Sequence, residues 1–152
     1  DKLKDEPFYW FKALVAAPGL EMRRVTEGAR HGKAALLIAN THQYGQAVSN
    51  NWAQTIPYEL AGRVVRVSGW VKTEEAEHVN ICVQGWADLV NMPSFASTEV
   101  VKGTQDWKRM TSKPVRLSPG VTIVTVRAVL TGTGKAWFDD ITLELADEEP
   151  VE

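Results

Sequence analysis

Residues 132–145 read GTGKAWFDDITLEL. A glycine-rich turn opens this stretch and an alternating segment follows it. The side chains of a β-strand alternate between its two faces, and one alternate set here is Trp137, Asp139, Ile141, Leu143 and Leu145. We expect this largely apolar set to point inward, which places the carboxylate of Asp139 on the buried side. A buried carboxylate needs hydrogen-bond donors, a cationic side chain or a metal ion as its partner.

The rest of the chain repeats this pattern of short alternating segments between turn residues. Strands are predicted over residues 8–15, 20–26, 33–40, 46–56, 63–73, 79–86, 106–112, 115–117 and 121–130. Residues 74–78 are expected to form a charged turn, and residues 87–98 a long loop with at most a short strand. No segment combines a helical period with helix caps. The sequence therefore predicts an all-β fold, a two-sheet antiparallel β-sandwich.

Composition restricts the class of protein. The chain has 152 residues, of which 44% are hydrophobic and 24% charged, so we expect one globular domain over 1–152 with frayed ends at 1–7 and 146–152. The net charge of −2 gives no electrostatic signal for nucleic acid or an anionic membrane, and no apolar run has the length of a membrane helix. The chain begins at Asp1 without a methionine, and we expect it to be a piece of a larger protein.

Five stretches, in order, resemble a known family. They are RHGKAAL at 30–36, WAQTI at 52–56, AGRVVRVSGWVKT at 61–73, GTQDWKR at 103–109 and AWFDDITLE at 136–144. Together they resemble the carbohydrate-binding modules of families 4, 9 and 22. The resemblance implies a jelly roll with the galactose-binding-domain-like fold. Binding residues vary among such modules, so the resemblance speaks for the fold more than for the ligand.

The resemblance also implies a structural calcium ion. In this family an aspartate at the position of Asp139 often ligates calcium, together with a glutamate near the N-terminus and carbonyls near a Gly-Lys turn. Residues 31–33 would supply the carbonyls here, and Glu6 or Glu21 the glutamate. Calcium takes 6–8 oxygen ligands, so Asp139 cannot hold it alone. The alternative is that Asp139 accepts backbone N–H bonds from a loop, and the sequence leaves both open.

Tryptophan is unusually frequent, with six copies. Sugar-binding sandwiches stack pyranose rings on flat aromatic side chains and fix the hydroxyls with amides and charged groups. Trp107 and Trp137 are expected to fill the core, and Trp10 is left undecided. The strand with Trp86 is expected to lie beside the strand with Trp70, so that both present one polar face. The candidate sugar-binding residues are Trp86, Trp70, Gln84, Asn80, Arg66, Arg127 and, more weakly, Trp52.

Catalytic residues are scarce. The three histidines show no metal-ligand spacing, and no serine elbow or phosphate loop occurs. Asp139 and Asp140 are neighbours on a strand, so they should point to opposite faces and cannot flank one glycosidic bond. Cys82 lacks a partner histidine signature and is expected to be a small buried hydrophobe. We therefore expect no enzymatic activity.

These observations predict a non-catalytic carbohydrate-binding module that targets an attached enzyme or surface protein to an oligo- or polysaccharide. The resemblance implies a location outside the cell or at its surface. The alternative is a sandwich of the same fold that has lost sugar binding and serves as a spacer or protein-interaction domain. Solvent exposure of Trp70 and Trp86 distinguishes the two.

Overall fold

The computed structural model of the protein describes residues 10–30 and 34–146. Every strand pairing in it is antiparallel, which confirms the predicted all-β class. The strands are β1 (Phe11–Ala13), β2 (Leu20–Val25), β3 (Ala35–Asn40), β4 (Ser49–Ile56), β5 (Val64–Trp86), β6 (Ser94–Ser97), β7 (Val101–Thr111), β8 (Val115–Arg116), β9 (Ile123–Thr131) and β10 (Gly134–Leu145).

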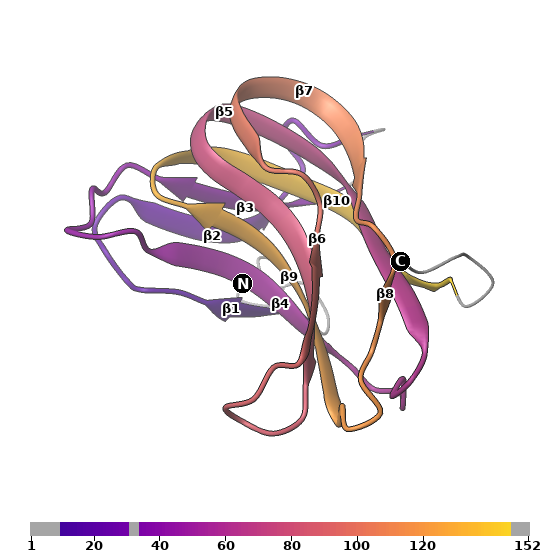
Figure 1. The fold of residues 1–152 in the computed structure, drawn as a ribbon. Coiled ribbons are helices and arrows are strands. Elements are labelled where there is room, and N and C mark those ends of the chain that lie inside the picture. The colour runs from indigo at the N-terminus through magenta and orange to yellow at the C-terminus, as the bar shows by residue number, and fades with distance from the viewer. Residues whose placement is uncertain (1–9, 31–33, 147–152) are drawn as a thin grey trace.

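The strand β5 organises the fold. It runs for 23 residues, bends over the top of the molecule in Figure 1, and returns on its other side. Its first half pairs with β10, β7 and β8, and its second half with β9 and β6. The two strands predicted at 63–73 and 79–86 are therefore one strand. The charged segment between them is the bend of that strand and not a turn.

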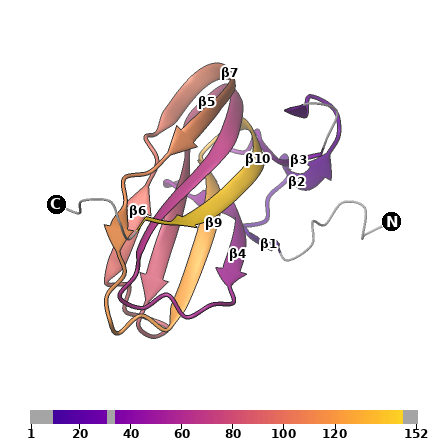
Figure 2. The ribbon, with the colours of Figure 1, turned by 90° about the vertical axis from the view of Figure 1, so that its right-hand side faces the viewer.

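The strands form two layers that share β5. The first layer contains β2, β3, β10, the first half of β5, β7 and β8; the second contains β1, β4, β9, the second half of β5 and β6. In Figure 2, after a quarter turn, β1, β2 and β3 lie toward one side of the molecule and β6 toward the other. This is the predicted antiparallel sandwich, built by folding one continuous hydrogen-bonded network over itself.

The bend of β5 needs irregular backbone. Glu75 has a φ of 47°, and the register against β7 shifts on both sides of Ala76. The β9–β10 turn packs on this bend: a Cβ on Gly134 would lie 2.6 Å from the carbonyl oxygen of Glu75, so this position requires glycine. Glu77 holds the same turn, because its Oε2 accepts hydrogen bonds from Thr133 N at 2.6 Å and Thr133 Oγ1 at 3.0 Å.

The main core lies between the layers. Both halves of β5 direct their odd-numbered aliphatic residues into it, and all are essentially buried: Val65, Val67, Val71, Val79, Ile81 and Val83. Trp52 and Phe138 are the largest fully buried side chains. Burial of apolar surface on this scale is the dominant stabilising term of the fold.

A second, smaller apolar cluster lies on the outer face of the first layer. Val25, Ala35 and Leu37 form it, and Trp107 and Trp137 pack against it while remaining partly exposed. Trp107 fixes the loop above, since its Nε1 donates to the carbonyl of Gly28 at 3.0 Å. The prediction that Trp107 and Trp137 fill the core between the sheets is therefore wrong. They cover an outer face instead.

A β-bulge in β10 explains why the predicted direction of the Trp137 side chain was wrong. The register against β5 shifts between Asp139 and Thr142, and Asp140 has a φ of 47°. Before the bulge, Phe138 points into the core and Trp137 away from it; after the bulge, Ile141 packs against the core as predicted. One inserted residue reverses the parity, so the alternation of 137–145 could not hold along the whole strand.

Candidate functional site

The outer face of the second layer carries the largest group of predicted site residues. Residues directly opposite in an antiparallel pair share a face. Cys82 lies opposite Arg127 and Ser97, and Gln84 opposite Phe95 and Thr125, so β5, β6 and β9 present these side chains together. We call the group Asn51, Asn80, Gln84, Trp86, Phe95 and Arg127 the polar face.

Hydrogen bonds hold the centre of the polar face. Arg127 donates from Nε to Oε1 of Gln84 at 2.8 Å and from Nη1 to Oδ1 of Asn51 at 3.0 Å. The indole Nε1 of Trp86 donates to the same Gln84 oxygen at 3.2 Å. Four side chains from β4, β5 and β9 are thereby fixed relative to one another. Three of them, Gln84, Trp86 and Arg127, were predicted from the sequence to act together.

The polar face has a further aromatic residue that sequence reasoning missed. Phe95 on β6 is 50% exposed and lies directly opposite Gln84. It sits in a segment expected to be mostly loop, where no alternation marked its direction. Beside it, Asn80 donates from Nδ2 to Oγ of Ser97 at 2.8 Å, so Asn80 is held as well. Asn51 was also missed, because the polar run at 49–51 obscured the alternation that places it on the outer face.

Trp70 and Arg66 do not join the polar face. They lie on the first half of β5, and that half belongs to the other layer. The expected platform of two neighbouring strands is therefore wrong, because the two stretches are halves of one bent strand. Arg66 pairs with Glu144 at 3.7 Å. Trp70 is partly buried beneath Arg30, whose guanidinium carbon lies 3.9 Å from the ring centre.

Trp52 is not a surface residue. It is 0% exposed in the main core, and its Nε1 donates to the carbonyl of Leu37 on β3 at 3.1 Å. The prediction that it binds sugar is wrong. The signal in the sequence was its even parity with Val48 and Ile56, which is the core-facing parity of β4; the polar neighbours at 49–51 obscured it.

Cys82 lies beneath the polar face and is 4% exposed. Burial raises the pKa of its thiol to about 11, although the nearby Arg127 guanidinium opposes the shift. The thiol is therefore neutral near pH 7. This agrees with the expectation of a small buried hydrophobe and gives no reactive nucleophile.

Asp139 has a cationic side chain as its partner. Its side chain is 10% exposed; Oδ2 lies 3.4 Å from Nη1 of Arg30, and Oδ1 accepts from the backbone N of Asp140 at 2.9 Å. Oδ2 of Asp140 lies 3.0 Å from the same Arg30 nitrogen. The carboxylate is thus buried as predicted, but on the outer face of the first layer, opposite Trp70 on β5.

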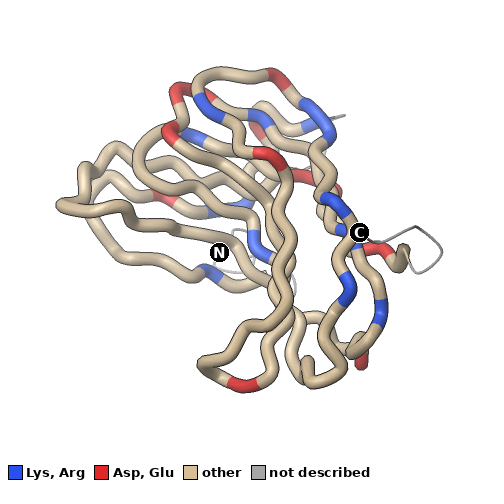
Figure 3. Tube along the Cα trace, viewed as in Figure 1, with Lys and Arg blue, Asp and Glu red and all other residues tan. Residues whose placement is uncertain are grey.

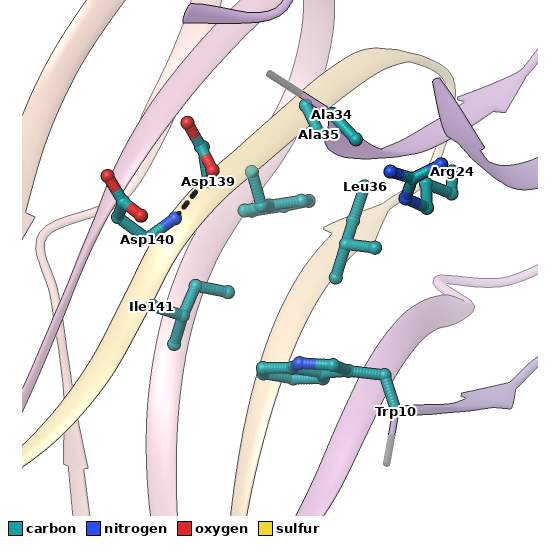
Figure 4. A pocket seen from close by; sticks show the side chains of 9 residues that line it. Trp10, Arg24, Ala34, Ala35, Leu36, Asp139, Asp140 and Ile141 are labelled. Carbon is teal, nitrogen blue, oxygen red and sulfur yellow. Dashed lines mark hydrogen bonds between the residues drawn. The ribbon is translucent and has the colours of Figure 1, made fainter. Parts of the chain in front are cut away.

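A cavity of about 280 Å³ adjoins this ion pair. In Figure 4, Trp10, Leu36 and Ile141 line its apolar part, and the two carboxylates lie at the end away from Trp10. Among the residues that line the cavity, Asp139 and Asp140 are the only carboxylates, and Arg24 is the only positively charged residue. The cavity is therefore half apolar and half ionic.

The described residues here do not fit a calcium site. A guanidinium occupies the position that a cation would take beside Asp139, and within 10–30 and 34–146 no three His, Cys, Asp or Glu side chains are grouped to hold a metal. Glu21 is exposed on β2 and pairs with Arg23 at 3.4 Å. Glu6 and residues 31–33, the other expected ligands, lie outside the described residues.

Within residues 10–30 and 34–146, no helix is long and apolar enough to span a bilayer.

Comparison with known proteins relates this architecture to solved structures. No protein-family model matches the sequence, and no curated protein matches it either. The C-terminal family 22 carbohydrate binding module of Xyn10B from Clostridium thermocellum is similar, with 18% identity and a TM-score of 0.65 over 97% of this chain and 91% of that one. The chain therefore has the jelly-roll fold of carbohydrate-binding modules, as the sequence predicted.

Other proteins share the fold. The Stig cyclase Fisc from Fischerella is 12% identical, with a TM-score of 0.70 over 94% of this chain and 87% of that one. Tailspike protein 4 of bacteriophage CBA120 is 10% identical, with a TM-score of 0.69; the match covers 91% of this chain and 20% of the tailspike chain. The fold thus serves binding modules and a cyclase, so function must be argued from the polar face itself.

Proposed function

We propose that this domain is a non-catalytic module that binds an oligo- or polysaccharide through the polar face. The observation that supports it most is the connected set Asn51, Arg127, Gln84 and Trp86, in which polar groups are already oriented on an outer sheet face. Preorganised donors and acceptors lower the entropic cost of binding a flexible chain. Trp86 and the exposed Phe95 supply planar surface against which pyranose rings stack.

The proposal also follows from what surrounds these groups. The outward side chains of β4, β6, β9 and the segment 79–86 of β5 bring amides, hydroxyls and aromatic rings together, and these strand segments contain no carboxylate. No acid–base pair is thereby provided for cleaving a glycosidic bond. Among solved structures with this fold, TmCBM61 is in complex with β-1,4-galactotriose, and the CBM22-1 module of Xyn10C from Paenibacillus barcinonensis is a xylan-binding domain.

Avidity is the mechanism we propose for the whole protein. A module that holds its covalently attached neighbour near a glycan raises the neighbour's effective concentration there. The same proposal includes attachment to an enzyme or surface protein and a location outside the cell or at its surface.

The test is binding of the purified domain to a panel of neutral and acidic polysaccharides, with Trp86→Ala and Phe95→Ala as variants. Loss of the stacking surface should weaken binding by about 1–3 kcal/mol for Trp86→Ala, with little change in melting temperature. Trp107→Ala is the matched control, since it removes an indole from the outer face of the other layer. Failure of the whole panel to bind, or equal losses from Trp107→Ala, would contradict the proposal.

A second candidate function is protein interaction, and one observation favours it. Leu89 and Val90, in the loop after Trp86, are 88% and 82% exposed, so both side chains lie outside the apolar core. If this loop contacts a protein, Leu89→Ser with Val90→Ser should abolish that contact while glycan binding by the polar face is unchanged.

A further inference from the structure

The charge on the polar face is unusual. β4 and β6 contain no charged residue, the segment 79–86 of β5 contains none, and β9 contains Arg127 alone. In Figure 3 the blue and red segments gather instead on β7, β8 and the bend of β5. Arg127 therefore places a single positive charge in the centre of an otherwise neutral surface.

No carboxylate of the residues that the structure describes forms an ion pair with Arg127. Within the described residues its guanidinium makes two hydrogen bonds, both to neutral amide oxygens, and no ion pair. The thiol of Cys82, directly opposite on β5, is protonated near pH 7 and supplies no negative charge. The side chain is partly buried, and removing a cation from water without a counterion is unfavourable.

The geometry leaves part of the guanidinium available to a ligand. Nε and Nη1 are fixed by Gln84 and Asn51, while Nη2 has no acceptor among the residues described. A guanidinium that is held on one side presents its remaining N–H groups in a fixed plane, which matches the two oxygens of a carboxylate. The side-chain oxygen of Gln84 accepts hydrogen bonds from Arg127 and Trp86, so its amide nitrogen can donate a hydrogen bond to a ligand oxygen.

We infer that the preferred ligand is an acidic glycan whose uronate carboxylate pairs with Arg127 while a neighbouring sugar ring packs on Trp86 or Phe95. This inference rests on the proposed glycan-binding function and deepens it by naming the substrate class. The uronate supplies the negative charge that the described strand segments of this face lack. A charge-assisted contact of this kind is stronger than a hydrogen bond to a neutral hydroxyl.

The experiment compares polygalacturonate and alginate with fully methyl-esterified polygalacturonate, xylan and galactan in binding titrations with the domain. Methyl esterification keeps the sugar chain and removes the charge. We expect at least about tenfold tighter binding of a uronate polymer than of the neutral polymers, and a preference that shrinks as salt is added. Arg127→Gln should remove the preference, and Arg127→Lys should restore only part of it because lysine lacks the planar fork.

Lys108→Gln is the matched control, since it removes one exposed positive charge from β7 on the other layer. It should change binding less than twofold, consistent with an exposed cation far from the ligand. Equal binding of esterified and free polygalacturonate, or a uronate preference that survives Arg127→Gln, would overturn the inference and leave the proposed function standing. Binding of none of these polymers would instead overturn the proposed function, and the inference with it.

Discussion

Arg30 lies between Trp70 and Asp139, with its guanidinium carbon 3.9 Å from the centre of the indole ring and its Nη1 3.4 Å from the carboxylate. The arginine therefore uses its flat face for a cation–π contact and its edge for ion pairs. This arrangement anchors the chain just before residues 31–33 to both β5 and β10. It gives Trp70 a structural task in place of the sugar-binding role expected from the sequence.

Trp70→Ala should therefore lower stability and leave glycan binding unchanged. Loss of the ring removes the cation–π contact and part of the packing on the first layer, at a cost of about 2 kcal/mol. Chemical denaturation would measure the change in unfolding free energy, and polysaccharide titration would show the unchanged affinity. A Trp70→Ala protein with normal stability and reduced glycan affinity would return Trp70 to the binding site.

Asp139→Ala should destabilise the protein by about 3 kcal/mol, because it removes a nearly buried carboxylate that pairs with the largely buried guanidinium of Arg30, whereas the other carboxylate beside that guanidinium, Asp140, is exposed. Asp140→Asn is the control. It removes the exposed carboxylate, preserves a residue type that tolerates positive φ, and should cost less than about 1 kcal/mol. Denaturation curves of the two variants provide the comparison.

Chelation separates the ion pair from a calcium site at the same residue. If Arg30 is the partner of Asp139, treatment with EDTA should leave the melting temperature unchanged. A bound calcium ion would stabilise only the native state, so its removal would lower the melting temperature, and added calcium would restore it. A reversible drop of this kind would show that residues outside the described part complete a calcium site.

Glu77 should make the β9–β10 turn sensitive to acid. Hydrogen bonds from the backbone N and then the hydroxyl of Thr133 lower the pKa of Glu77 below its usual value of 4.5. The folded pKa lies below the unfolded one, so the stabilisation is present above about pH 4.5 and is lost as the pH falls through the folded pKa. Melting temperatures between pH 6 and 3 should fall more steeply in wild type than in Glu77→Gln. Identical slopes would contradict the assignment.

Cys82 should resist alkylation in the folded protein. Its thiol is buried and its pKa is raised to about 11, so little thiolate forms at pH 8. Iodoacetamide followed by mass measurement should show no modification until denaturant is added. Rapid labelling of the native protein would contradict this prediction and show that β9 readily detaches from β5 where Arg127 pairs with Cys82.

The strands of this protein could be predicted where alternation is regular. Val79, Ile81 and Val83 set the core side of their segment, and that prediction placed Asn80, Gln84 and Trp86 correctly on an outer face. The outward direction of Arg127 was predicted in the same way, because Val124 and Val126 set the core side of β9. Local periodicity carries this information because it depends only on which face of one strand is buried.

Features that depend on irregular backbone could not be predicted. The bulge at Asp140 reverses the parity of β10, and the bend at Glu75 joins two segments that read as separate strands. Neither position is a glycine, the residue type that usually marks positive φ. The partner of Asp139 was also hidden, because Arg30 is 109 residues away in the sequence and only the folded loop brings it there.

The shared strand β5 makes the two layers one cooperative unit. In a sandwich of separate sheets, one sheet can loosen while the other keeps its hydrogen bonds. Here, β9 and β10 pair with two halves of the same strand, β5. Detachment of β9 therefore removes hydrogen bonds from the strand that also holds β10, and β5 cannot straighten without breaking its pairing with both strands. Amide protons on β9 and β10 should therefore exchange with solvent through a common opening with similar free energies. Ligand bound on the polar face should slow exchange in β10 as well, although β10 lies in the layer that does not carry the ligand.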